Sequence, residues 1–198
     1  MNDIKYKEME RIIIDKNNID NIEEDIIIRR GIERYMYVRQ FVYGDVLDIA
    51  CGVGYGSYLL AKNPDVNCIF AVDKKEKAIK IANDNFKNEK IKFVVEQPEY
   101  ITGKFDVLVC LETIEHLDDP KVLKEMVDRC DIREIIISFP SKKTTHYNKY
   151  HIWDINKEVV ISLFDNFELY KTNYLHDSII LNLVKIERNR TSAKRYTY

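Results

Sequence analysis

Long apolar runs, an excess of one charge and a signal-peptide core are all absent from this chain. No apolar run approaches the roughly 18 residues that a membrane-spanning helix needs, and the first residues are polar. The formal net charge is −2 on 198 residues, which gives no electrostatic reason to expect general nucleic-acid or membrane binding. We therefore expect a cytoplasmic protein without a membrane span.

Cysteine is sparse, and its spacing argues against a disulfide framework or a Cys-x-x-Cys metal site. The four cysteines stand at positions 51, 68, 110 and 130, and the first three fall inside or at the ends of apolar segments. They are expected to be reduced, small apolar residues. Internal repeats and low-complexity segments are also absent. With 45% apolar residues, the chain can build one substantial core, so we expect one domain.

The hydrophobic pattern predicts a doubly wound α/β fold. Apolar strand patterns alternate with helical ones, which favours a mostly parallel sheet. Two further strands are joined only by His176 and Asp177, so they should form an antiparallel hairpin. The expected strands cover residues 45–50, 67–73, 91–96, 105–111, 132–139, 167–174 and 178–186, and a helix is expected over 119–130.

Charged residues with apolar positions at helical spacing predict a helical cap before the sheet. The pattern runs from residue 3 to about 42, with a break near Asn17 and Asn18. We therefore divide the chain into an N-terminal helical cap (1–42), the main domain (43–187) and a polar basic tail (188–198). The four positive charges of the tail are interpreted as a solvated terminus.

Half of the six glycines stand on alternate positions of one loop. They are Gly52, Gly54 and Gly56, and they follow the apolar strand that begins at Val46. Glycine at such positions allows a tight strand-to-helix turn, and it also lets the backbone approach a nucleotide cofactor at the start of a helix. Both interpretations of the loop remain open at this point.

A carboxylate lies at the tip of the next predicted strand. Asp73 ends the apolar segment that begins at Cys68, 17 residues after Gly56. In an open α/β sheet the ligand crevice lies beyond the carboxyl ends of the strands, where an acid can accept hydrogen bonds from a ribose diol. An acid at this position is equally compatible with a cap for the helix that follows.

Asp48 separates two classes of nucleotide cofactor. A nicotinamide dinucleotide places its pyrophosphate over a G-x-G-x-x-G loop, whereas this loop reads Asp48-x-Ala-x-Gly52-x-Gly54-x-Gly56. A carboxylate beside the loop repels a pyrophosphate, but it suits a cofactor with a sulfonium and an ammonium group, directly or through water. The pattern resembles the class I S-adenosylmethionine-dependent methyltransferases.

The resemblance extends over roughly residues 30 to 187. The segment from Phe105 to Pro120 resembles the fourth strand and the Glu-x-x-Glu-His-Leu turn of methyltransferases of the 11/23 type, similar to the ubiquinone-biosynthesis O-methyltransferases. This resemblance implies a seven-stranded sheet that closes with an antiparallel strand, and S-adenosylhomocysteine as the product. It also implies contacts to the cofactor from Asp48, Ala50, Gly52, Gly54, Asp73, Gln97, Leu111 and Glu112.

Two positions depart from the family pattern. Ala50 stands where the family often has its first glycine, so we expect this residue to keep a negative φ. Gln97 and Pro98 stand where the family offers an acidic side chain and the next backbone N–H to adenine, and proline has no N–H. The amide oxygen of Gln97 can still accept a hydrogen bond from the adenine amino group.

Methyl transfer needs a nucleophile roughly 3 Å from the methyl carbon and a group that manages one proton. Glu112, Glu115 and His116 stand at i, i+3 and i+4, so they would share one face of a helical turn. His116 is a candidate general base, because an unperturbed imidazole has a pKa of about 6.5. With His151 or His146, these residues are also a candidate site for Mg²⁺ or Mn²⁺. A packing role for the turn, without a metal, stays open.

The segment 140–155 is a predicted substrate lid. Its aromatic and histidine side chains lack a continuous apolar pattern, and long loops at this edge of the sheet are often functional. Trp153 is equally compatible with anchoring the loop to the core. The candidate substrate-binding residues are His146, Tyr147, Tyr150 and His151.

The sequence therefore predicts an S-adenosylmethionine-dependent methyltransferase that methylates an oxygen of a small hydroxylated metabolite or a sugar-containing precursor. Three alternatives remain. They are a metal-dependent RNA 2′-O-methyltransferase, which the acidic net charge disfavours, a nicotinamide-dependent oxidoreductase, and a non-catalytic module that binds the cofactor.

Overall fold

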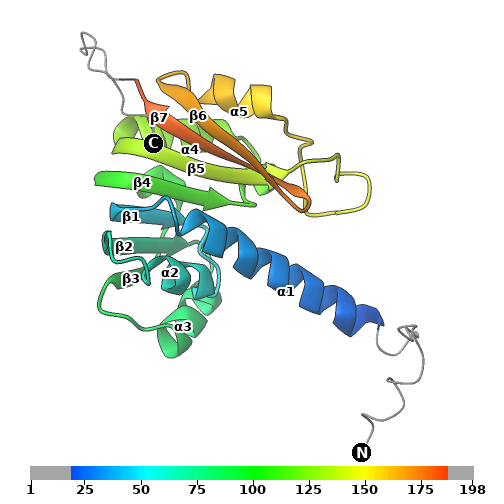
Figure 1. Ribbon diagram of the computed structural model, residues 1–198, viewed down its shortest axis with the longest axis horizontal. Coiled ribbons are helices and arrows are strands. Elements are labelled where there is room, and N and C mark those ends of the chain that lie inside the picture. Colours follow the sequence, from blue (N-terminus) through cyan, green and yellow to red (C-terminus); the bar gives the residue numbers. More distant parts are fainter. Residues whose placement is uncertain (1–18, 187–198) are drawn as a thin grey trace, which may run out of the picture.

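The computed structural model describes residues 19–186, and its centre is a seven-stranded sheet (Figure 1). The strand order is β3-β2-β1-β4-β5-β7-β6, and only the pairs β5–β7 and β7–β6 are antiparallel. The doubly wound fold and the antiparallel hairpin are confirmed, and each strand lies within one residue of its predicted bounds. The strands are β1 (Gly44–Ile49), β2 (Val66–Asp73), β3 (Ile91–Val95), β4 (Lys104–Leu111), β5 (Asp131–Pro140), β6 (Phe167–Leu175) and β7 (Ser178–Lys185).

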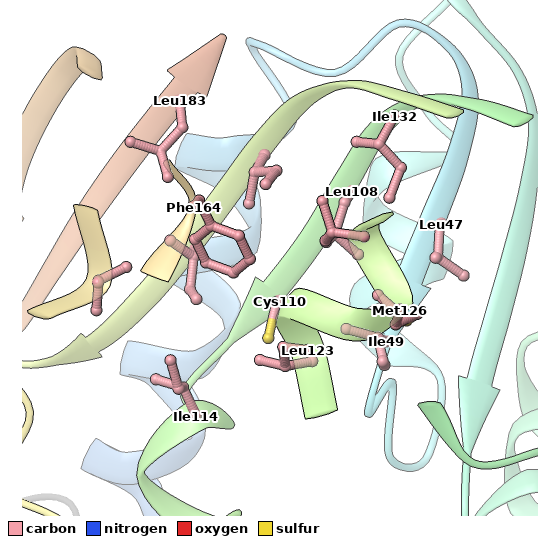
Figure 2. Packing of buried hydrophobic residues seen from close by; sticks show 14 of the residues in the cluster. Leu47, Ile49, Leu108, Cys110, Ile114, Leu123, Met126, Ile132, Phe164 and Leu183 are labelled. Atoms are coloured by element: carbon pink, nitrogen blue, oxygen red, sulfur yellow. The ribbon is translucent and has the colours of Figure 1, made fainter. Parts of the chain in front are cut away.

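Helices cover both faces of the sheet, because side chains of the inner strands alternate between two apolar cores. Val46 packs into the core under α1, α2 and α3, whereas its neighbour Leu47 packs into the core under α4 and α5. Figure 2 shows the second core, where Leu123 and Met126 of α4 lie beside Phe164. The helices are α1 (Ile19–Val38), α2 (Tyr55–Leu60), α3 (Glu76–Asn85), α4 (Lys121–Arg129) and α5 (Lys157–Leu163), with short 3₁₀ helices η1 (Pro98–Tyr100) and η2 (Ile114–His116).

The predicted N-terminal cap is represented by α1. The earlier part of the predicted helix, the break near Asn17–Asn18 and the basic tail over 188–198 lie outside the described residues. The C-terminal half of α1 packs on the body, where Tyr35 and Val38 are buried. Its N-terminal half projects beyond the sheet (Figure 1).

All four cysteines are free, as expected for reduced thiols. Cys51, Cys110 and Cys130 are buried, but Cys68 is exposed on β2, so it is not the core residue that its apolar neighbourhood predicted. Within residues 19–186, no helix has the length and the apolar character needed to cross a membrane.

Gly56 is required by close packing between α1 and α2. A Cβ atom added here would lie 2.1–2.4 Å from carbon atoms of the Tyr35 ring. We expect Gly56→Ala to lower the free energy of unfolding by about 1–3 kcal/mol, the usual cost of overpacking a core. Urea denaturation measures this change.

The control for this prediction is the same substitution in a Tyr35→Leu background, which removes the ring atoms that clash. There the cost of Gly56→Ala should fall well below its cost in the natural chain. An equal cost in both backgrounds would show that the Tyr35 ring is not the reason for glycine at this position.

Candidate functional site

An open cleft of about 890 Å³ lies at the carboxyl ends of the parallel strands. This is the edge at which open α/β sheets bind ligands, and the volume suits a ligand of nucleoside size. The lining includes Ala50 and Gly52 after β1, Asp73 at the end of β2, Glu96 and Pro98 after β3, Glu112 and Thr113 after β4, His116, and Tyr150 of the 140–155 loop.

The three alternate glycines have different roles. Gly52 has a φ of 57°, and nothing lies within 4 Å of the place where its Cβ would be, so its bare backbone faces the open cleft. A Cβ on Gly54 would lie 2.6 Å from Ala82 and 2.8 Å from Phe93, and Gly56 packs on Tyr35. Close approach to a ligand is therefore available at Gly52. The tight-turn interpretation fits Gly54, which has a φ of 88°, whereas Gly56 lies within α2 and is required by packing.

Two non-glycine residues at the strand tips have left-handed backbones. Ala50 has a φ of 55°, so the expectation that it keeps a negative φ is wrong. Glu112, at the tip of β4, has a φ of 48°. The conformation of Ala50 is held by the next residue, because the Cys51 N–H donates to the Val72 carbonyl at 2.9 Å. Such backbones cost about 1–3 kcal/mol each and concentrate at functional sites.

Asp73 lines the cleft and also ties two strand tips together. Its Oδ2 accepts from the Gly52 N–H at 3.0 Å, and its Oδ1 accepts from the Lys75 N–H at 2.8 Å, just before α3. The second contact lies before the helix: the N-cap of α3 is Lys75, and no side chain makes a capping hydrogen bond there, so Asp73 is not a helix cap. Each carboxylate oxygen still has a lone pair, so the residue can also accept hydrogen bonds from hydroxyls in the cleft.

Asp48 lies beneath the glycine loop and outside the residues that line the cleft. It is fully buried, and its carboxyl group accepts from the Tyr35 hydroxyl at 3.2 Å and from Ser57 Oγ at 2.6 Å. Burial raises its pKa from 3.8 to about 7, against the opposing effect of the two hydrogen bonds. In this structure the carboxyl group ties the loop to α1 and α2.

Glu96 lines the cleft, and sequence reasoning missed it. β3 ends at Val95, so Glu96 is the first residue after the strand, and its Oε1 accepts from the Gln97 N–H at 3.0 Å. The acidic side chain and the following backbone N–H that the family offers to adenine are thus present at Glu96 and Gln97. They stand one position before the pair Gln97 and Pro98 that the resemblance aligned. Gln97 is exposed and Leu111 is buried, and neither is among the lining residues.

Lysines after β2 were also missed as cleft residues. Lys74, Lys75 and Lys77 line the cleft beside Asp73. The signal that could have identified them is their position directly after a strand tip.

Glu115, His116 and His151 form a compact group, with one ligand atom from each residue lying within 4.8 Å of the others. Glu115 is 1% exposed, and neither of its carboxyl oxygens has a hydrogen-bond partner among the described residues. Burial, and secondarily the charge of Glu112, raises its pKa from 4.5 to about 8.

Both imidazoles of this group have one nitrogen engaged. His116 Nδ1 donates to the Tyr150 carbonyl at 2.8 Å, which leaves the Nε2 lone pair free at 4.0 Å from Glu115 Oε1. His151 Nδ1 lies 2.6 Å from Thr144 Oγ1, and burial lowers the pKa of His151. A hydrogen bond on one ring nitrogen is the usual way in which a ligating histidine is oriented.

The predicted metal set is smaller in the structure, because Glu112 does not join the group. The turn is a short 3₁₀ helix that begins at Ile114, so Glu112 precedes it and does not share its face. The side chain of Glu112 instead accepts from Ser138 Oγ at 2.7 Å. His146, the alternative histidine, is exposed and lies edge-on to Tyr147.

The 140–155 loop is attached to the turn by two hydrogen bonds. The Ile152 N–H donates to the Glu115 carbonyl at 2.8 Å, and Trp153 Nε1 donates to the Leu117 carbonyl at 2.8 Å. The anchoring interpretation of Trp153 therefore holds. Of the predicted substrate residues, Tyr150 lines the cleft, whereas His146 and Tyr147 are exposed outside it.

Comparison with known proteins shows what the chain is similar to. Its fold is Rossmann-like, and residues 46–131 match the family described as a methyltransferase domain. The chain is 26% identical to the mitochondrial ubiquinone biosynthesis O-methyltransferase of Saccharomyces cerevisiae, over 75% of this chain and 54% of that protein. It is 31% identical to the ubiquinone biosynthesis O-methyltransferase of Coxiella burnetii, over 43% of this chain and 36% of that protein.

Solved structures agree on the fold. The N-methyltransferase NodS of Bradyrhizobium japonicum, in complex with S-adenosylhomocysteine, has a TM-score of 0.65 at 17% identity, covering 80% of this chain and 86% of its own. Magnesium protoporphyrin IX methyltransferase of Synechocystis, also with S-adenosylhomocysteine, has a TM-score of 0.66 at 16% identity, covering 92% and 93%. The solved structures show the same fold, and the match to the methyltransferase domain covers residues 46–131. The chain spans about half or less of the length of the two curated relatives.

The buried Asp48 makes stability depend on pH. Its folded-state pKa of about 7 lies above the ordinary 3.8, so the folded chain binds this proton more tightly than the unfolded chain. The contribution of Asp48 to the free energy of unfolding therefore falls as the pH rises from about 4 to about 7. We expect wild type to lose stability relative to Asp48→Asn across this window, by a few kcal/mol at most. Urea denaturation at several pH values measures this difference.

The matched control is Asp65→Asn, a substitution at an exposed carboxylate. Its stability should follow that of the wild type over the same pH range. A constant difference between wild type and Asp48→Asn would mean that this carboxyl group titrates normally.

Proposed function

We propose that this chain transfers a methyl group from S-adenosylmethionine to an oxygen of a small hydroxylated metabolite or a sugar-containing precursor. The observation that carries the proposal is the arrangement of Gly52 and Asp73 at the open cleft. The bare backbone of Gly52 leaves room for a ligand, and Asp73 presents carboxylate oxygens to the same space.

The residues present fit this cofactor. Asp73 would accept hydrogen bonds from the ribose diol, and the Glu96 carboxylate would accept from the adenine amino group, with Ala78 and Ile81 as apolar lining. Glu112 and Thr113 would contact the methionine portion. The cofactor would supply a sulfonium-bound methyl group.

His116 is the proposed proton acceptor for the acceptor hydroxyl. Its Nδ1–H is used by the Tyr150 carbonyl, so the Nε2 lone pair is available toward the cleft. As the new O–CH₃ bond forms and the S–CH₃ bond breaks, Nε2 takes the hydroxyl proton directly when no metal is bound. If Nε2 instead held a cation, the hydroxyl would be made more acidic by the metal and would lose its proton to solvent. Tyr150 lines the cleft beside it and would contact the acceptor.

We further propose that Glu115, His116 and His151 hold a divalent cation. A buried carboxylate without hydrogen-bond partners is costly unless a proton or a cation compensates it. Two imidazoles and one carboxylate favour Mn²⁺ over Mg²⁺, because Mg²⁺ prefers oxygen ligands alone. A bound cation would lower the pKa of an acceptor hydroxyl and orient it.

An RNA 2′-O-methyltransferase stays an alternative because the same group of ligands could bind a terminal diol. The methyltransferase domain of bacterial CtHen1-C has a TM-score of 0.65 at 15% identity, which supports the fold alone. Filter binding to RNA that weakened steeply with salt would favour this alternative. Cofactor binding without turnover on any acceptor would favour a non-catalytic module. A cytoplasmic location also stays a prediction, and the yeast relative is named as mitochondrial.

Cofactor binding is the first test. We expect S-adenosylhomocysteine to bind the wild type in a calorimetric titration, and Asp73→Ala to weaken binding by about tenfold to a hundredfold, because charge-assisted hydrogen bonds to the ribose are lost. The control is Asp84→Ala, at an exposed carboxylate on the nearby α3. Absence of binding by the wild type, or equal affinity in Asp73→Ala, would overturn the proposed cofactor site.

The cation site is tested with Mn²⁺ on the same protein. Glu115→Gln and His151→Ala should each weaken Mn²⁺ binding by about tenfold or more and should slow methyl transfer to a panel of catechols and sugars. His146→Ala is the matched control, since this histidine lies in the same loop outside the group. If wild type binds no Mn²⁺ while His116→Ala still abolishes transfer, the base acts without a metal.

A further inference from the structure

The outer side of α1 carries exposed apolar side chains that nothing in the described part of the chain covers. Ile32 is 37% exposed and Met36 is 45% exposed. The helix packs on the body through another side, where Tyr35 and Val38 are buried. Figure 1 shows its N-terminal half extending away from the sheet.

Ile32 and Met36 belong to a row with coiled-coil spacing. At 3.6 residues per turn the row covers an arc of about 80°, and its centre lies roughly 130° around the helix from the packed side. Steps of three and four residues are those that bring two helices together along a seam. We call this row the outer stripe; it consists of Ile22, Asp25, Arg29, Ile32 and Met36.

The outer stripe is complementary to itself in the reversed direction. About a centre at Ile27, Asp25 and Arg29 are equally distant on opposite sides, and so are Ile22 and Ile32. Two antiparallel copies would therefore place each aspartate against an arginine and each isoleucine against an isoleucine. Within residues 19–186, neither Asp25 nor Arg29 has an ion-pair partner.

We propose that α1 pairs antiparallel with α1 of a second copy of this chain, which forms a twofold symmetric dimer through the outer stripe. In such a pair the same patch serves both subunits, as self-complementary charge requires. The sheet packs on the C-terminal half of α1, on the side that holds Tyr35 and Val38. In an antiparallel pair the two sheets would therefore lie at opposite ends, and the outer stripe would stay accessible. This inference does not depend on the proposed reaction.

The pairing would also bear on the cofactor loop. Arg30 forms an ion pair with Asp177 at the turn between β6 and β7, at 2.7 Å, and Tyr35 hydrogen-bonds to Asp48 beneath the loop. The helix that would form the dimer seam is therefore the one that contacts both the loop and the hairpin.

Sedimentation equilibrium of the full chain tests the dimer. Asp25→Arg places two arginines opposite each other at two symmetric points of the seam, and Arg29→Asp does the same with two aspartates. Each single variant should weaken self-association by about tenfold or more. The combined variant Asp25→Arg/Arg29→Asp restores opposite charges across the seam, so it should recover the dimer.

Glu24→Arg is the matched control, because it makes the same charge change on the neighbouring residue, which points about 120° away from the stripe. Its self-association should equal that of the wild type. Binding of S-adenosylhomocysteine should be unchanged in all four variants, which keeps this test distinct from the test of the cofactor site.

Three outcomes would overturn the proposal. They are a wild type that stays monomeric at every concentration, a combined variant that fails to recover the dimer, and a control variant that weakens association as much as Asp25→Arg. Binding of the monomer to anionic lipid vesicles through Ile32 and Met36, lost in Ile32→Asp, would assign the stripe to a membrane surface instead.

Discussion

The buried carboxyl group of Asp48 is the contact on which the glycine-loop side of the cleft depends. It receives hydrogen bonds from Tyr35 of α1 and Ser57 of α2, so one residue of β1 holds both helices against the glycine loop. Burying a carboxyl group is costly, and the two donors offset part of that cost. With Tyr35 held in place, Gly56 must lack a side chain. Gly54 is crowded by Ala82 and Phe93, so Gly52 is the one glycine of the three in this loop that faces open space.

The strand tips around the cleft share a second constraint, which is backbone strain. Ala50 and Glu112 both have positive φ values, and each is held by hydrogen bonds to the neighbouring strand. Asp73 joins the tips of β1 and α3 by accepting from two backbone N–H groups. The strain costs about 1–3 kcal/mol per residue, and the packed sheet must compensate it. The cleft is therefore shaped by the backbone before any ligand binds.

The acceptor side is organised by Glu115, which is buried without a hydrogen-bond partner among the described residues. Its backbone carbonyl and the Leu117 carbonyl hold the 140–155 loop, so the same turn that buries the carboxylate also brings His151 to it. A carboxylate left without donors beside two oriented imidazoles is an arrangement that a proton or a cation would complete. This makes the turn the centre of the proposed chemistry.

The sequence by itself determined the strands, their order in the chain, and the placement of Gly52 and Asp73 at one edge of the sheet. Apolar runs specify buried strands, and the carboxyl ends of parallel strands meet at one edge. Only the tertiary structure decided which glycine stays open, that Asp48 faces inward, that Glu96 lines the cleft, and that Glu115 joins His151 without Glu112. These outcomes depend on burial and on contacts between residues far apart in the chain, which local spacing does not encode.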